Sequence, residues 1–135
     1  MERYTADAVS LLAYLVDSLP SRTDQIFAAA EAGEAVIQAP STALGEILYS
    51  VSRDKDVRGV TLSGTPENAR EALIGRGPIS LAPIEETETV EYVRVIERFS
   101  IHDAFVVASH RTHETDAILT SDAVIRASGV KTVWN

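Results

Sequence analysis

The sequence predicts an α/β protein in which helices cover both faces of a mostly parallel central sheet, a three-layer α/β/α sandwich. Short β-like runs alternate with helical runs along the whole chain, and this alternation is typical of parallel sheets that lie between helices. The 135 residues contain no internal repeat and no segment long enough to separate two domains. We therefore expect a single domain over residues 1–135, because this length is that of one compact core.

In the first half of the chain, hydrophobic periodicity separates two strands from three helices. An apolar stripe with helical spacing stops before Pro20, because the residue that precedes a proline disfavours helical backbone. Gly33 marks the end of a second helix, and Pro40 marks the start of a third. The expected elements are a strand at 4–6, helices at 9–16 and 21–33, a strand at 35–38 and a helix from 40 to 51.

The second half resumes the alternation after an irregular polar segment at 54–63. Thr65 followed by Pro66 is an N-cap and first-turn signal, and Ser100 is the N-cap signal of a later helix. That later helix is apolar on nearly all sides at its centre and should be deeply buried. The expected elements are a helix at 65–75, a strand at 79–82, helices at 85–99 and 101–113, a strand at 117–120, a helix at 121–127 and a strand at 129–134.

The composition excludes several classes of protein. The chain has no cysteine, which excludes a disulfide framework and a Cys-ligated zinc site. Its formal net charge of −8 disfavours non-specific binding to nucleic acid. Only two of the twelve basic residues are lysines, and such an acid-rich surface repels itself unless salt screens it. We read this charge as a halophilic trait, with ordinary solubility charge as the alternative.

The sequence gives no sign of a membrane segment. Its apolar runs are too short to cross a bilayer, and its first residues lack the apolar core of a signal peptide. We expect a cytoplasmic protein. The sequence also lacks the glycine-rich phosphate loops and the HExxH and GxSxG motifs. His110 and His113 could share a helix face, but without a third nitrogen or sulfur ligand nearby we interpret them as a solvated helix end rather than a zinc site.

Four acidic residues lie in apolar surroundings, where a solvated charge is not expected. Two of them follow strands, at the edge where parallel sheets bind ligands. Carboxylates gathered there repel one another unless a cation neutralises them, and an all-oxygen donor set favours Mg²⁺ or Mn²⁺ over zinc. Such ions orient a water molecule, lower its pKa and stabilise an attacked phosphodiester. The four acids are Asp7 and Asp122 after strands, Glu46 in an apolar helix and Asp103 at the start of the buried helix.

Each acid taken singly also has a purely structural interpretation. Asp7 and Asp122 could cap the helices that follow them, and Asp103 completes an S-x-x-D capping pattern with Ser100. Glu46 could point outward into solvent. The joint pattern of all four is more specific than any one of them.

That joint pattern resembles the PIN-domain nucleases, and in particular the small VapC-like toxins. The resemblance covers nearly the whole chain, and its four motifs stand in the family's order. They are YTADAVSLLAYL at 4–15, PSTALGEIL at 40–48, SIHDAFVVA at 100–108 and ILTSD at 118–122.

The resemblance implies metal-dependent cleavage of RNA by Asp7, Glu46, Asp103 and Asp122, with Mg²⁺ or Mn²⁺ as cofactor and Thr120 as a supporting polar group. One position departs from the family pattern. The small hydroxyl or amide residue often found two places after the first acid is Val9 here, and Ser10 is expected to face elsewhere. A catalytically inactive PIN-like scaffold that binds RNA or protein is therefore the alternative to the enzyme. A phospho-receiver domain fits less well, because Asp7 has no paired acid beside it.

The resemblance also implies partners. VapC-like proteins act as homodimers and are silenced by a small antitoxin that occupies the active cleft. The apolar stripe of Val90, Val93 and Ile96 is a candidate dimer surface, although we first interpret it as core packing. The basic residues in 53–58 are the candidate contacts for RNA phosphates.

Overall fold

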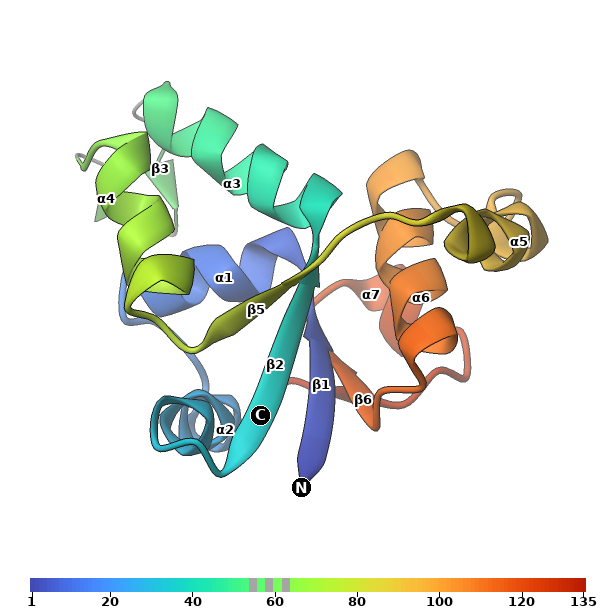
Figure 1. Ribbon diagram of the computed structural model, residues 1–135, viewed down its shortest axis with the longest axis horizontal. Helices are drawn as coiled ribbons and strands as arrows, with labels where there is room; N and C mark the ends of the chain where they lie inside the picture. Colours follow the sequence, from blue (N-terminus) through green and yellow to red (C-terminus); the bar gives the residue numbers. More distant parts are fainter. Residues whose placement is uncertain (54–55, 58–59, 62–63) are drawn as a thin grey trace.

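The central sheet has five strands, all parallel, in the order β5-β2-β1-β6-β7 (Figure 1). The computed structural model describes residues 1–53, 56–57, 60–61 and 64–135, without side chains at 54–63. The sheet is formed by β1 (Glu2–Ala6), β2 (Ala35–Pro40), β5 (Ile79–Ala82), β6 (Ala117–Leu119) and β7 (Thr132–Val133). Within the described part, β3 (Asp56–Val57) and β4 (Val60–Thr61) form a separate antiparallel pair.

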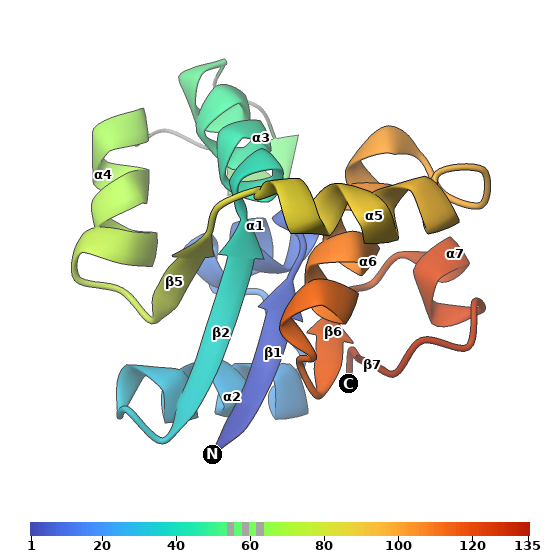
Figure 2. The ribbon, with the colours of Figure 1, turned by 45° about the vertical axis from the view of Figure 1, so that its right-hand side comes forward.

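Helices lie on both faces of this sheet, as Figures 1 and 2 show from two sides. Five regular helices are longer than five residues: α1 (Ala8–Leu15), α2 (Ser21–Glu31), α3 (Ser41–Ser52), α5 (Glu86–Val95) and α6 (Ile101–His113). Short segments complete the layers: α4 (Pro66–Arg70), which continues into a π-helical turn, η1 (Glu71–Gly75), and α7 (Ala123–Arg126).

The alternation of side chains along the strands divides the core into two parts. On one face, Tyr4, Ile37 and Leu119 pack with buried residues of α1, α2 and α3. On the other face, Ile118 packs with Val106 and Val107 of α6 and with residues around α5 and α7. Successive strand residues point to opposite faces, so the neighbours Ile118 and Leu119 belong to different cores. The expected three-layer α/β/α sandwich is confirmed.

Most predicted boundaries agree with the structure to within a few residues, and the differences have local causes. Pro40 marks the start of α3 as predicted, but as its N-cap rather than its first helical residue: its φ of −65° and ψ of 151° are extended, so it also ends β2 and pairs with Ala82. A proline φ near −65° fits both an extended residue and a first helical turn, so the sequence did not distinguish them. The helix predicted at 85–99 ends at Val95, and the closing strand is limited to Thr132–Val133.

The interpretation of the α5 stripe as core packing is wrong. Val90, Val93 and Ile96 expose 55%, 70% and 44% of their surface. The buried side of α5 is instead formed by Glu88 and Val95. The apolar stripe therefore lies on the outside of the helix layer.

Two further expectations concern the basic segment at 53–58 and the absence of a membrane segment. The basic segment is predicted to contact RNA, and its side chains beyond Arg53 lie outside the described residues. Within the described part of the chain, no helix is long and apolar enough to cross a membrane.

Candidate active site

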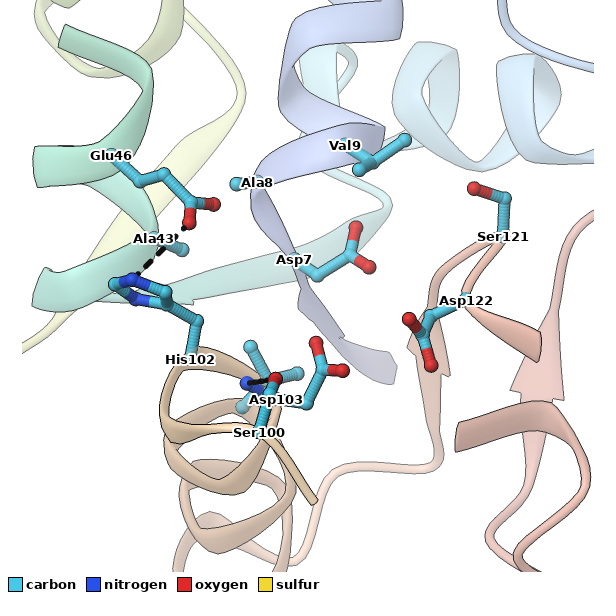
Figure 3. A pocket seen from close by; sticks show the side chains of 11 residues that line it. Asp7, Ala8, Val9, Ala43, Glu46, Ser100, His102, Asp103, Ser121 and Asp122 are labelled. Atoms are coloured by element: carbon cyan, nitrogen blue, oxygen red, sulfur yellow. Dashed lines mark hydrogen bonds and ion pairs between the residues drawn. The ribbon is translucent and has the colours of Figure 1, made fainter. Parts of the chain in front are cut away.

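A pocket of about 370 Å³ opens at the carboxyl edge of the sheet, and all four predicted acids line it (Figure 3). β1 ends at Ala6 and β6 ends at Leu119, paired side by side, so the residues that follow them enter the same space. The N-termini of α3 and α6 approach from other sides. The lining comprises Asp7, Ala8, Val9, Ala43, Glu46, Ser100, His102, Asp103, Val106, Ser121 and Asp122.

Asp7 is the most buried of the four acids, with 5% of its surface exposed. Its carboxylate accepts hydrogen bonds from the backbone N–H of Ser10, at 2.9 Å, and from the hydroxyl of Thr120. Burial raises the pKa of Asp7 to about 6, although both hydrogen bonds act to lower it. Asp7 thus caps α1, as its structural interpretation required, and also faces the pocket.

Thr120 supports the site from behind. Its hydroxyl donates to Asp7 and accepts from the backbone N–H of Asp122 at 3.0 Å. One oxygen of Asp122 accepts from the N–H of Ile125 at 2.9 Å, which makes Asp122 the N-cap of α7. A single buried hydroxyl therefore positions two of the acids relative to each other.

The predicted S-x-x-D capping pattern of Ser100 and Asp103 is present, and Asp103 also lines the pocket. The N-cap of α6 is Ser100, whose hydroxyl accepts from the backbone N–H of Asp103 at 3.4 Å. The Asp103 carboxylate points into the pocket toward Asp122 (Figure 3). Burial raises the pKa of Asp103, and the negative charge of Asp122 raises it further. This is the electrostatic sign of carboxylates crowded into one site.

Glu46 reaches the pocket from α3, so its interpretation as an outward-pointing residue is wrong. Its Oε1 lies 3.6 Å from Nε2 of His102, and Figure 3 shows this pair at the side of the pocket away from Asp122. Among the described residues, His102 is the one basic residue of the lining. It directly precedes Asp103, but no motif or spacing in the sequence marks it as a site residue.

The oxygen atoms of the four pocket acids are of the kind that binds a hard divalent cation. The pocket presents four carboxylates and no sulfur, and the repulsion between them is the condition that a cation relieves. Among the described residues, however, no three His, Asp or Glu side chains lie close enough together to form a ready-made metal site. Three of the acids are instead engaged with protein partners: Asp7 with Ser10, Glu46 with His102, and Asp122 with Ile125.

The neighbours of Asp7 on α1 have the predicted orientations. Val9 lines the pocket and exposes 42% of its surface. The Ser10 hydroxyl is buried and donates to the main-chain oxygen of Asp7 at 2.8 Å. An apolar side chain therefore stands where the family pattern often has a polar one.

The interpretation of His110 and His113 as a solvated helix end is wrong. His110 Nδ1 lies 2.7 Å from the Thr115 hydroxyl, which in turn lies 2.8 Å from that of Thr5. His113 Nε2 lies 3.7 Å from the carboxylate of buried Glu88. Both rings pack inward because α6 lies flat against the sheet and α5 covers it.

The crowding of carboxylates predicts the effect of neutralising Asp103. Without divalent ions, Asp103→Asn should raise the free energy of unfolding by up to about 1 kcal/mol, because one repelling charge is removed. The stabilisation by added Mg²⁺ should shrink, since a ligand stabilises the folded state according to its affinity. Thermal melts with and without Mg²⁺ measure both effects.

The control for this experiment is Glu97→Gln, which removes one exposed acid outside the pocket. It should leave the Mg²⁺ effect unchanged. An Asp103→Asn protein that is destabilised without metal and keeps the full Mg²⁺ effect would contradict the crowded-carboxylate interpretation.

Comparison with known proteins bears on the fold. No protein-family model and no curated protein sequence matches the chain. A chain of the VapBC2 complex of Rickettsia felis, solved with a promoter DNA fragment, matches with a TM-score of 0.70 and 14% identity over 98% of this chain and 99% of that one. VapC20 of Mycobacterium tuberculosis, a sarcin-ricin loop cleaving toxin, matches with a TM-score of 0.64 and 19% identity over 98% and 99%. The chain therefore has the PIN-like fold of the VapC structures over nearly its whole length.

Proposed function

We propose that the protein is a metal-dependent endoribonuclease that hydrolyses RNA phosphodiester bonds, and that it is the toxin of a toxin–antitoxin pair. The observation that carries this proposal is the convergence of Asp7, Glu46, Asp103 and Asp122, from four different elements, on one pocket. The VapC-like fold supports it, and so does the name of VapC20 as a toxin that cleaves the sarcin-ricin loop. In this proposal residues 1–135 are one nuclease domain.

The four acids would hold Mg²⁺ or Mn²⁺, which supplies an activated water and neutralises charge on the attacked phosphate. The chain's own residues prepare this site. Thr120 and the Ser10 N–H fix the orientation of the Asp7 carboxylate, and Asp122 is fixed by its cap to α7. Glu46 reaches the pocket beside His102, with 3.6 Å between its Oε1 and the His102 Nε2. No side-chain nucleophile is required.

The phosphates of RNA and the carboxylates of the pocket are both negatively charged and repel each other. A bound metal ion would therefore also help the pocket to bind phosphate. His102 stands at the pocket beside Glu46 with 57% of its side chain exposed, where a substrate phosphate could contact it. The basic residues at 53–58 remain the other candidates for phosphate contacts.

The alternative is an inactive scaffold that binds RNA or protein without cutting it. Val9 in the pocket lining and the absence of a ready-made ligand cluster among the described residues are the observations in its favour. The two functions differ in one measurable property: only the enzyme cleaves RNA when metal is added.

The nuclease predicts cleavage of structured or single-stranded RNA in Mg²⁺ or Mn²⁺ that stops when EDTA is added in excess. Asp122→Asn should lower the rate by at least about 100-fold, because a charged ligand is lost while the amide oxygen still caps α7. Gel assays of labelled RNA measure the rate. Asp24→Asn, an exposed change on α2, should cleave like the wild type. Cleavage that persists in excess EDTA would exclude the metal mechanism.

The proposed partners are a second copy of the chain and a small antitoxin that occupies the pocket. Val90, Val93 and Ile96 support the homodimer, because they form an exposed apolar surface on the outside of α5. The VapBC2 complex supports the antitoxin by its fold similarity. A cytoplasmic site of action fits an RNA substrate.

A charge placed on the α5 surface should break the dimer. Val93→Glu buries a carboxylate at the proposed contact, so light scattering should show a monomer at concentrations where the wild type is a dimer. Val124→Glu is the matched control, because this residue is 55% exposed on α7, outside the proposed contact. A wild type that is monomeric at every concentration would contradict the dimer.

The acidic surface predicts a dependence on salt, as the halophilic interpretation requires. If self-repulsion limits stability, the thermal midpoint should rise from dilute buffer to molar monovalent salt, because the screening length falls below roughly 10 Å above 0.1 M. A thermal midpoint that does not change over this range would contradict the halophilic proposal and favour the alternative, in which the negative charge serves ordinary solubility.

A further inference from the structure

The contact between α5 and α6 contains a buried acid that the proposed nuclease does not use. Figure 2 shows α5 lying across α6 on the outer layer of the molecule. The Tyr92 ring of α5 contacts the Phe105 ring of α6, with 4.2 Å between centroids. One helical turn before Tyr92, Glu88 also faces inward and exposes only 1% of its surface.

The polar groups at this contact lack hydrogen-bond partners within the described structure. Both carboxylate oxygens of Glu88 and the Nε2 of His113 are buried and make no hydrogen bond, although Nε2 lies 3.7 Å from the Glu88 Oε1. The buried hydroxyls of Ser109 and Thr112 are unpaired as well, and helical spacing places them on the α6 side that carries Phe105. Unpaired polar groups of this kind are rare in protein interiors and require an explanation.

A charge on Glu88 would be costly in this position. Burial, together with the smaller effect of the negative charge of Glu85, raises its pKa to about 7. His113 is the basic group that faces it from α6, with its Nε2 3.7 Å from the Glu88 Oε1. Arg3 of β1 donates to the main-chain oxygen of His113, which holds the end of α6 in place.

The remaining charged groups nearby are otherwise engaged or exposed. Glu91 pairs with Arg94 at 2.9 Å along the outer part of α5, and Glu86 is exposed. His110 of α6 lies against Thr115 on the sheet side. Glu88, which is almost fully buried, and His113, whose side chain is 26% exposed, therefore form a pair whose charge is set by the protons that it holds.

We propose that Glu88 and His113 form a proton-controlled latch that fastens α5 onto α6. When Glu88 is protonated, it carries no charge at the contact and α5 stays packed on α6. Loss of that proton leaves a charged carboxylate shielded from water, and this cost is relieved when α5 loosens and Glu88 meets water. The apolar surface on the outer side of α5 would then lose its fixed position. The latch stands whether or not the chain is a nuclease.

Hydrogen–deuterium exchange of the wild-type protein at pH 6 and pH 8 tests the latch, with rates corrected for the intrinsic effect of pH. Opening that exposes Glu88 should become about ten-fold more frequent over these two pH units, given a group whose pKa shifts from 4.5 in the open state to about 7 in the closed state. The increase should appear in the amides of 86–95 and not in those of α2.

Two variants complete the test. Glu88→Gln is isosteric and uncharged, so exchange in α5 should no longer depend on pH. Glu86→Gln removes an exposed charge from the same helix and should keep the ten-fold change. The latch is refuted if wild-type α5 exchanges equally at both pH values, or if Glu88→Gln retains the wild-type dependence. The wild-type measurement decides the matter even if Glu88→Gln fails to fold.

Discussion

The hydrogen bond from the Thr120 hydroxyl to the buried Asp7 carboxylate joins the ends of the two central strands of the site. β1 and β6 pair in parallel up to Ala6 and Leu119, so the residues that follow each strand emerge side by side. The same hydroxyl receives the N–H of Asp122. The position of two acids therefore follows from strand register, and the N-termini of α3 and α6 bring the other two.

The carboxylates gathered in the pocket lower the stability of the folded protein. Asp7 has a pKa of about 6 in the folded protein, in place of the ordinary 3.8. The free energy of unfolding of the metal-free protein should therefore fall as the pH rises from 3.8 to about 6, because the unfolded chain releases this proton more readily. Above this range the pocket holds carboxylates that desolvation and mutual repulsion disfavour. The hydrogen bonds that Asp7 and Asp122 accept offset part of that cost, and a divalent cation could offset more.

Signals that act locally could be predicted from the sequence, and tertiary contacts could not. The Ser100 cap and the apolar centre of α6 depend on residues close together in the sequence, so they could be predicted. The grouping of Asp7 and Asp122 could be predicted as well, because residues that follow parallel strands meet at the same edge of the sheet. Periodicity showed that Val93 lies on an apolar stripe, but only packing decides whether a stripe is covered. Glu88 had no sequence signal, because an acid in an amphipathic helix is ordinarily solvated. The inward direction of His113 depends on α5 in the same way.

The two groups of buried acids differ in what can neutralise them. The pocket is open, so a cation can enter among its carboxylates, whereas Glu88 faces inward from α5, exposes only 1% of its surface and has His113 as its basic neighbour. α6 contributes to both places: Asp103 in its first turn lines the pocket, and His113 at its end is the basic neighbour of Glu88. Its centre is held against the sheet by Ala104, Val107 and Ala108, which are fully buried. Loosening of α5 should therefore disturb its outer apolar surface while α6 keeps Asp103 in the pocket.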